Sequence, residues 1–320
     1  MHPINRLIAS KKLTLFALAA GILIATLPNA RADYTPQQTE TQQTAKTQFI
    51  EAKGVRYAYR RFGKATGIPL VFLIHIRGTM DDWDPAVING FARDRPVILF
   101  SNAGLGLSGG ETADTIAGMA AHVTNFLDGL NLAKVDLLGF SIGGFVAQQV
   151  TLDRPDLIHR LILAGTSPQG GVNTQGFSPE TAKHAGIANP KVEDRLYLFF
   201  GQSESSMKAG WEFAKRWKER STDLEPPVTM AQYQRQLKAG IAWGVKQETP
   251  YARLKEIKQP VLIVNGNHDV MLDSVNSYVM YQNIANAKLI MYPDSGHAAL
   301  FQYADQFVED ATRFLNTPDH

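Results

Sequence analysis

The sequence has no cysteine among its 320 residues. This absence excludes disulfide bonds and thiol catalysis, and it also excludes a lipid anchor attached to a cysteine. Stability must therefore come from the apolar core alone. The chain is 44% hydrophobic and 19% charged, which suits one large globular domain or a domain carrying an insertion and argues against disorder.

Spacings typical of metal and nucleotide sites are also missing. There is no His-x-His or His-Glu-x-x-His pattern of the kind that binds zinc. There is no P-loop, and no Gly-x-Gly-x-x-Gly stretch opens a helix. We therefore expect no metal, no cofactor and no bound nucleotide.

Basic and acidic residues are nearly balanced, with a formal net charge of +2 at pH 7. Four basic residues and no acidic residue lie within residues 1–32, so the rest of the chain carries 28 basic and 30 acidic residues. No basic surface for nucleic acid is expected on the remaining protein.

The main apolar run, Leu13 to Leu27, has 15 residues and is shorter than the roughly 20 that span a bilayer as a helix. It follows Arg6, Lys11 and Lys12, and it precedes Ala30-Arg31-Ala32, which places small residues at −3 and −1 of a cleavage site. This order is typical of a secretory signal peptide over residues 1–32. We expect an exported, periplasmic or secreted protein; an uncleaved leader is the alternative and the one expected contact with a membrane.

Residues 33–48 are polar and rich in Thr and Gln, which indicates a flexible linker. From Phe49 onward, short apolar runs alternate with helical spacing, and they are apolar throughout rather than at every second residue. Such runs are typical of strands buried on both faces. The continuous runs are Leu70–Ile76, Val97–Phe100, Val135–Phe140, Leu161–Ala164, Val261–Val264 and Lys288–Tyr292. Before them, Phe49–Ala52 and Arg56–Phe62 indicate two strands joined around Gly54. They predict an α/β fold with a mostly parallel, doubly wound sheet, opened by an antiparallel hairpin.

Residues 169–250 interrupt this alternation. They contain no convincing strand, whereas Arg195–Phe200, Met207–Trp217 and Met230–Trp243 have helical spacing. A segment this long is unusual as a plain connection. We predict a helical cap over residues 169–250, inserted between the two parts of the core at 49–168 and 251–320.

Two stretches match Gly-x-Ser-x-Gly, the pattern of a nucleophilic serine on a tight turn. The first, around Ser108, lies several residues past a strand in a glycine-rich stretch with no immediate helix, and it is typical of a flexible surface turn. The second, around Ser141, has the strand Val135–Leu138 directly before it and helical spacing over Gly144–Leu152 directly after it. This strand–turn–helix setting favours Ser141 as the nucleophile.

A serine nucleophile needs a base, and the base needs an acid that orients it. His297 follows the last predicted strand, at the carboxyl edge of the sheet, and is the favoured base; His268 is its competitor, and His75 is interpreted as a packing or loop-shaping residue. Asp269 follows the strand Val261–Val264 and is the favoured acid, with Asp273 as the alternative. The order Ser, Asp, His along the chain is that of the α/β-hydrolase triad.

Val135–Gly144, Gly266–Asp269 and Asp294–His297 resemble the α/β-hydrolase superfamily, over nearly all of residues 49–316. Capped enzymes related to enol-lactonases, esterases and cofactor-free haloperoxidases or perhydrolases are the most similar. Haloalkane dehalogenases use an Asp nucleophile, so Ser141 argues against that group.

The resemblance implies that backbone N–H groups of Ile142 and Arg77 stabilise the oxyanion. The family usually has His-Gly where this chain has His75-Ile76, so the amide of Ile76 is the alternative to that of Arg77. The family's Asp before the glycine-rich loop is also missing, and Ser101 stands near its place.

These observations predict a serine hydrolase that acts on a small ester or lactone with an apolar or aromatic acyl group. Peracid formation or carbon–carbon bond hydrolysis on the same triad is one alternative. A catalytically inactive binding protein on the same scaffold is another, because Ile76 departs from the family's oxyanion loop.

Overall fold

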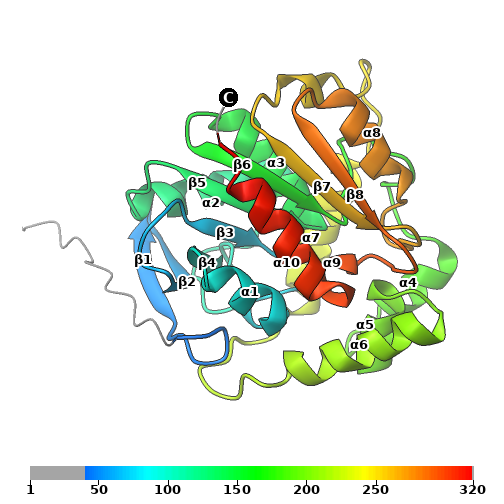
Figure 1. The fold of residues 1–320 in the computed structure, drawn as a ribbon, viewed down its shortest axis with the longest axis horizontal. Coiled ribbons are helices and arrows are strands. Elements are labelled where there is room, and N and C mark those ends of the chain that lie inside the picture. The colour runs from blue at the N-terminus through cyan, green and yellow to red at the C-terminus, as the bar shows by residue number, and fades with distance from the viewer. Residues whose placement is uncertain (1–39, 319–320) are drawn as a thin grey trace, which may run out of the picture. The chain divides into compact units, whose positions relative to one another are not determined.

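The computed structural model describes residues 40–318, and an eight-stranded sheet runs through them in the order β1-β2-β4-β3-β5-β6-β7-β8 (Figure 1). Strands β3 to β8 are parallel to one another, while β2 pairs antiparallel with β1 and with β4. The strands are β1 Gln48–Ala52, β2 Val55–Gly63, β3 Leu70–Leu73, β4 Pro96–Phe100, β5 Val135–Phe140, β6 Ile158–Ala164, β7 Val261–Gly266 and β8 Ala287–Tyr292. The predicted mostly parallel α/β sheet is confirmed.

The central strands are buried on both faces, as their unbroken apolar runs predict. Every residue of β3, β4, β5 and β7 is buried. Along β3, Leu70 and Phe72 belong to one apolar core, and Val71 and Leu73 belong to a second core on the opposite face. Side chains of a strand alternate between faces, so each run contributes to both cores.

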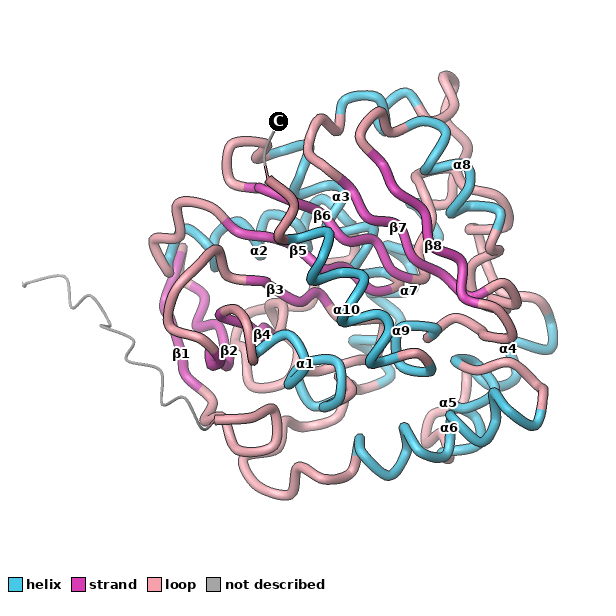
Figure 2. Tube along the Cα trace, viewed as in Figure 1, coloured by secondary structure: helices cyan, strands magenta, loops and turns pink. Residues whose placement is uncertain are grey.

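Helices cover both faces of the sheet (Figure 2). Helices α1 Pro85–Ala92, α9 Ala299–Gln302 and α10 Ala304–Leu315 supply the first core, and α2 Ile116–Gly129, α3 Ile142–Asp153 and α8 Val275–Asn283 supply the second. The short 3₁₀ helix η1 Met80–Asp82 contributes Met80 to the first core, and η2 Ala252–Glu256 contributes Leu254 to the second. Within residues 40–318 no helix is long and apolar enough to cross a bilayer.

The described end of the predicted linker is packed against the fold instead of being a free spacer. Gln42 and Ala45 are buried, and the Gln42 amide donates to Asn89 Oδ1 at 2.8 Å. Arg220 donates to the carbonyl oxygens of Gln42 and Ala45 at 2.7 and 2.9 Å. These partners come from distant parts of the chain, which local composition does not reveal. Residues 33–39 and the predicted leader, 1–32, lie outside the described residues.

Residues 169–250 contain four helices and no strand: α4 Pro179–Ala185, α5 Val192–Phe199, α6 Glu204–Trp217 and α7 Met230–Trp243. Thr229 caps α7 through its hydroxyl, which accepts from Gln232 N, and the Gln232 side chain accepts from Thr229 N in return. Phe213 stacks on Trp217 within α6 and on Phe301 of α9. This aromatic pair at i and i+4 therefore packs the helix against the core.

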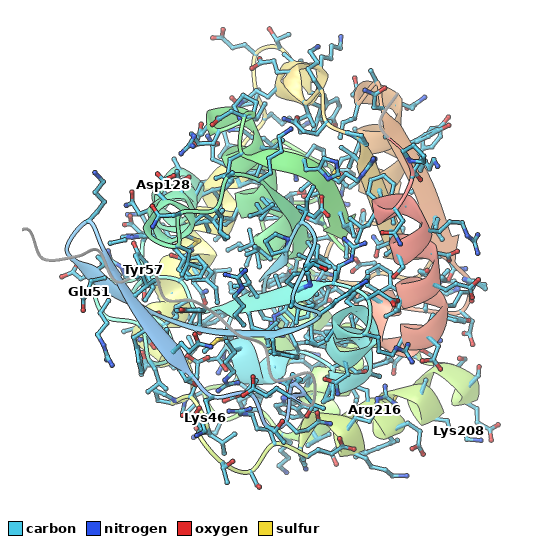
Figure 3. All side chains as sticks on the ribbon, turned by 60° about the vertical axis from the view of Figure 1, so that its left-hand side comes forward. Lys46, Glu51, Tyr57, Asp128, Lys208 and Arg216 are labelled. Atoms are coloured by element: carbon cyan, nitrogen blue, oxygen red, sulfur yellow. The ribbon has the colours of Figure 1, made fainter. Side chains whose placement is uncertain are left out.

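Two ion pairs fasten these helices to the core. Arg216, labelled on α6 in Figure 3, binds both carboxylate oxygens of the fully buried Asp84 at 2.9 and 2.6 Å. Arg195 of α5 binds Asp82 of η1 at 2.7 Å. A two-point arginine–carboxylate pair fixes orientation as well as distance, so α6 has a defined position over α1.

Glu225, between α6 and α7, is a buried carboxylate inserted into the core beside Ser101. It accepts hydrogen bonds from Ser101 Oγ, Leu107 N and Met80 N, all within 2.9 Å. Burial raises the pKa of Glu225, and these hydrogen bonds oppose that rise. Gly106 leaves room for it, because a Cβ there would lie 2.1 Å from Glu225 Oε1. Glu225 thus brings a carboxylate to the region where Ser101 stands in place of the family's Asp.

Candidate active site

Ser141 occupies the turn between β5 and α3. Its backbone φ of 59° and ψ of −124° is unusual for a residue other than glycine and is maintained by tertiary contacts. The Ser141 amide donates to Ala164 O at 3.0 Å, and its carbonyl accepts from Thr166 Oγ1 and Gly144 N, both at 2.8 Å. These bonds fix the strained turn on β6 and on the first turn of α3.

The two glycines of the motif are required by close packing. A Cβ on Gly139 would lie 2.4 Å from Gly143 O, and a Cβ on Gly143 would lie 2.0 Å from Leu73 O. No real Cβ approaches backbone oxygen so closely, so any side chain at either position would open the turn. The strand–turn–helix geometry predicted around Ser141 is present.

The structure brings Asp269 and His297 together from two loops. Asp269 follows β7 and His297 follows β8, and both side chains are almost fully buried. His297 Nδ1 lies 2.8 Å from Asp269 Oδ2, while Asp269 Oδ1 accepts from the amides of Met271 and Leu272 at 2.8 and 3.0 Å. Because a carboxylate only accepts, we assign the proton to Nδ1, which leaves the lone pair on Nε2.

The alternative acid and base do not take part in the Asp269–His297 hydrogen bond. Asp273 accepts a hydrogen bond from the side chain of Asn173 at 2.7 Å and lies just before α8. His268 is exposed, and its backbone amide donates to Ser295 O. In the described chain, Asp269 is the carboxylate bonded to His297.

Ser108, in the other match to Gly-x-Ser-x-Gly, is buried and hydrogen-bonded to the backbone. Its turn is not a loose surface loop: the side chain is buried, Oγ donates to Ser101 O at 2.6 Å, and it accepts from Ala58 N at 2.8 Å. These bonds hold the glycine-rich loop against β2. The hydroxyl is hydrogen-bonded to two backbone groups, one as acceptor and one as donor.

The two predicted oxyanion donors have different surroundings. Ile142 is the first residue of α3, where the amides of the first turn have no partner within the helix. Arg77 has φ 63°, and its amide donates to Oε1 of Gln236, a buried side chain of α7, at 3.0 Å. The Arg77 guanidinium donates to the carbonyl oxygens of Ala185 and Ile187. Residues 169–250 therefore contact both the amide and the guanidinium of Arg77, which the sequence did not suggest.

Ser141 lines two small neighbouring cavities, which we treat as two lobes of one pocket. The first, which we call the histidine lobe, measures about 60 Å³ and is also lined by His75, His297, Arg77, Arg195, His184, Leu198, Phe199 and Tyr233. The second, the apolar lobe, measures about 50 Å³ and is also lined by Ile142, Phe145, Leu237, Ile241 and Leu272. Ile76, Phe177 and Met271 border both lobes. The narrow volumes favour small groups on either side of Ser141.

The cap also supports the loop that carries His297. Ala298 N donates to Phe199 O at the end of α5 at 2.8 Å, and a Cβ on Gly296 would lie 2.8 Å from the same oxygen. Asp294 accepts from the hydroxyls of Ser203 and Ser205, which lowers the pKa of its carboxyl. The position of His297 thus depends on contacts from α5 and the following turn.

His75 lies two residues after the end of β3, and its Nδ1 is 2.7 Å from Ile76 O. Its ring packs edge-on against Phe140 and Phe199. Burial lowers the pKa of His75 to about 4; nearby Asp82 opposes this effect, and Arg195 and His297 add to it. His75 is therefore neutral at pH 7, and its lowered pKa makes it a weaker base than an ordinary histidine.

We expect this buried neutral histidine to make stability depend on pH. Between pH 4 and about 6.5 the unfolded chain protonates His75 and the folded chain does not, so the free energy of unfolding rises with pH. Relative to His75→Gln, which does not titrate, the wild type should gain about 3 kcal/mol across this window. Urea unfolding at pH 4, 5, 6 and 7 measures the difference; a constant difference would contradict a neutral buried ring.

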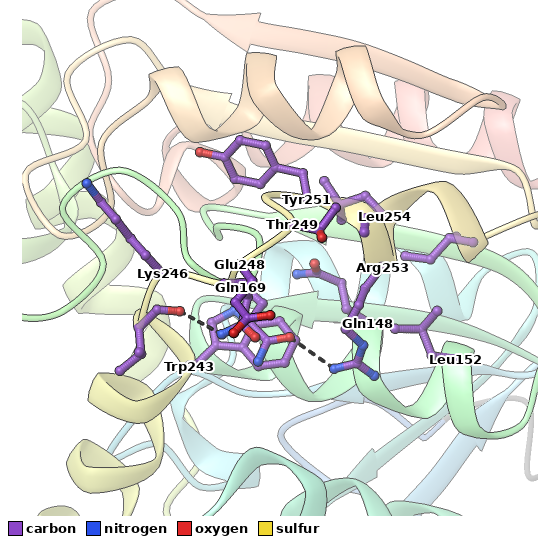
Figure 4. A pocket seen from close by; sticks show the side chains of 14 residues that line it. Gln148, Leu152, Gln169, Trp243, Lys246, Glu248, Thr249, Tyr251, Arg253 and Leu254 are labelled. Atoms are coloured by element: carbon purple, nitrogen blue, oxygen red, sulfur yellow. Dashed lines mark hydrogen bonds between the residues drawn. The ribbon is translucent and has the colours of Figure 1, made fainter.

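A larger pocket, of about 510 Å³, lies elsewhere and contains none of the candidate triad (Figure 4). It is formed where the chain leaves α7, beside Trp243 and Tyr251. Arg253 donates to the side-chain oxygens of Gln149 and Gln169 at 3.0 and 3.1 Å. Its size does not mark the reactive site, and within residues 40–318 no group of three or more His, Cys, Asp or Glu is placed to hold a metal ion.

Comparisons with known proteins identify the fold family. The family model described as alpha/beta hydrolase fold matches residues 68–303. An alpha/beta hydrolase fold protein from Chitinophaga pinensis is 38% identical, covers 87% of this chain and 100% of its own, and superposes with a TM-score of 0.82. The enol-lactonase from Burkholderia xenovorans LB400 shares the fold at 19% identity, 84% and 100% coverage and a TM-score of 0.68.

A pimeloyl-[acyl-carrier protein] methyl ester esterase of Nitrosomonas europaea is 25% identical over 183 residues, which cover 55% of this chain and 69% of the esterase. The family match spans strands β3 to β8, the turn at Ser141 and the loops that carry Asp269 and His297. The chain belongs to the α/β-hydrolase fold family, whose members are hydrolases.

Proposed function

We propose that this hydrolase cleaves small carboxylic esters or lactones through an acyl-enzyme on Ser141. The observation that carries the proposal is the Asp269–His297 hydrogen bond, which leaves Nε2 of His297 available in the lobe that Ser141 also lines. The similarity to an esterase and to an enol-lactonase supports the same reaction class.

In the proposed reaction, Ser141 Oγ attacks the substrate carbonyl carbon and its proton passes to His297 Nε2. The carbonyl oxygen becomes an oxyanion, stabilised by the Ile142 amide and by a second amide of the Arg77 loop. The carbon–oxygen bond to the leaving alcohol then breaks, and His297 returns the proton to that oxygen. Water, activated by His297, hydrolyses the acyl-serine and restores the hydroxyl.

The second oxyanion donor requires a small rearrangement if it is Arg77. Its amide donates to Gln236 Oε1, so the substrate oxygen has to replace that side-chain oxygen. Ile76, which borders both lobes, offers the neighbouring amide. With Arg77 as the donor, the exchange substitutes one acceptor for another and leaves its amide paired in the complex.

A fluorophosphonate probe tests the proposal, because it phosphonylates only an activated serine. We expect stoichiometric labelling of the wild type, with the adduct on Ser141 by mass spectrometry, and turnover of p-nitrophenyl butanoate by the unlabelled protein. Labelling on another serine would overturn the assignment, and no labelling with no turnover would favour a binding protein.

We also propose that the protein is exported with loss of residues 1–32. The charged, apolar and small-residue order of the leader motivates this proposal. The protein recovered from the periplasm or medium of an expressing bacterium should begin at Asp33 by N-terminal sequencing. A chain that retains Met1 in the membrane fraction would instead show an uncleaved anchor.

A further inference from the structure

His75 presents an unused hydrogen-bond acceptor inside the candidate active site. Its Nδ1 faces the carbonyl oxygen of Ile76 at 2.7 Å, so Nδ1 carries the proton and Nε2 carries the lone pair. Nε2 is buried and has no hydrogen-bond partner among the described residues. A buried acceptor without a donor is costly, so such an atom in a binding site calls for a ligand donor.

One other atom of the same lobe has this property, Nε2 of His297. The proposed reaction gives this atom a partner, because Nε2 of His297 receives the proton of Ser141 Oγ in the first step, although the structure shows no hydrogen bond between the two atoms. His75 has no such role, since its lowered pKa makes it a poor base. The unpaired Nε2 of His75 is therefore not accounted for by the proposed reaction.

The position of His297 indicates which part of the substrate reaches His75. His297 returns its proton to the departing oxygen, so the leaving group must extend on its side of Ser141. His297 and His75 both line the histidine lobe, and neither of them lines the apolar lobe. The leaving group therefore occupies the histidine lobe, and the acyl group occupies the apolar lobe.

We propose that His75 is a specificity-determining residue that accepts a hydrogen bond from an O–H or N–H group on the leaving group. The preferred substrates are then esters of short apolar acids with alcohols that carry a hydrogen-bond donor near the ester oxygen. This inference rests on the proposed esterase function, because it presumes the direction in which the alcohol leaves.

Three butanoate esters separate the effect of a hydrogen-bond donor on the alcohol from the effects of the alcohol's size and of its electron withdrawal. The 2-hydroxyethyl ester has the donor, the propyl ester has its size without the donor, and the 2-methoxyethyl ester has a similar inductive effect without the donor. Each kcat/KM is divided by the rate constant for hydroxide-catalysed hydrolysis of the same ester. We expect the wild type to prefer the 2-hydroxyethyl ester about tenfold over both others.

Variants of His75 identify the acceptor. His75→Leu removes it and should lower the preference to about one, whereas His75→Gln returns an oxygen acceptor and should restore part of it. His122→Leu is the matched control: His122 bonds Tyr57 and lines neither lobe, so the preference should persist. Circular dichroism and thermal unfolding confirm that each variant is folded.

Each outcome decides the inference. A wild-type preference near one would overturn it, as expected if water satisfies Nε2, and it would leave the esterase function standing when the propyl ester is turned over. A preference that survives in folded His75→Leu would also overturn it, because another group would then be the acceptor. A wild type that labels at no serine and hydrolyses none of the esters would remove both the esterase function and this inference.

Discussion

Replacing Ser141 with alanine is expected to lower kcat by about 10⁴- to 10⁶-fold while the fold is retained. The loss follows from the proposed reaction, in which Ser141 Oγ is the atom that receives the acyl group. Folding should persist because the bonds that hold the turn use the backbone of Ser141, from its amide to Ala164 O and from Thr166 Oγ1 to its carbonyl. The rate of p-nitrophenyl butanoate hydrolysis measures the loss of kcat, and circular dichroism measures whether the fold is retained.

Ser108→Ala is the matched control, because Ser108 lies in the second Gly-x-Ser-x-Gly match. Its hydroxyl joins Ala58 N to Ser101 O and lines neither lobe at Ser141. We expect activity within a few-fold of wild type and a loss of about 1–3 kcal/mol in the free energy of unfolding, since Ala58 N is left without its acceptor. Equal losses of activity in the two variants would mean that the nucleophile is wrongly assigned.

The contrast between these serines shows what local pattern can predict. Ser141 could be chosen because the residues that shape its turn are neighbours: β5 before it, α3 after it and glycines on either side. The sheet was predictable for a related reason, since strands buried on both faces are apolar throughout. Strand boundaries were less predictable: β6 begins at Ile158, three residues before the apolar run Leu161–Ala164 begins.

Contacts between distant segments account for what the sequence did not reveal. Gln236 reaches the Arg77 amide across 159 positions, and Glu225 reaches Ser101 across 124. Neither residue belongs to a motif, and a polar side chain on a helix or loop is by default expected in solvent. His75 had one signal, its place at the end of a central strand, but its unpaired nitrogen depends on tertiary packing.

Replacing Asp269 with asparagine is expected to cost about 10⁴ in kcat, although the two side chains have nearly the same size. Asp269 Oδ1 accepts from the amides of Met271 and Leu272, so the oxygen of an asparagine stays on that side and its NH₂ faces His297. An NH₂ group only donates, so His297 must then present the lone pair of Nδ1 to it. The proton moves to Nε2, the atom that should accept the proton of Ser141.

Asp273→Asn provides the control, since Asp273 bonds Asn173 and does not contact His297. We expect its kcat/KM to stay within a few-fold of wild type on the ester that shows the large loss in Asp269→Asn. Fluorophosphonate labelling adds a second measurement: Asp269→Asn should label slowly because the base is in the wrong tautomer, while Asp273→Asn should label at the wild-type rate. If Asp273→Asn were the inactive variant, the loop after β7 would have to rearrange on substrate binding and exchange the acid that orients His297.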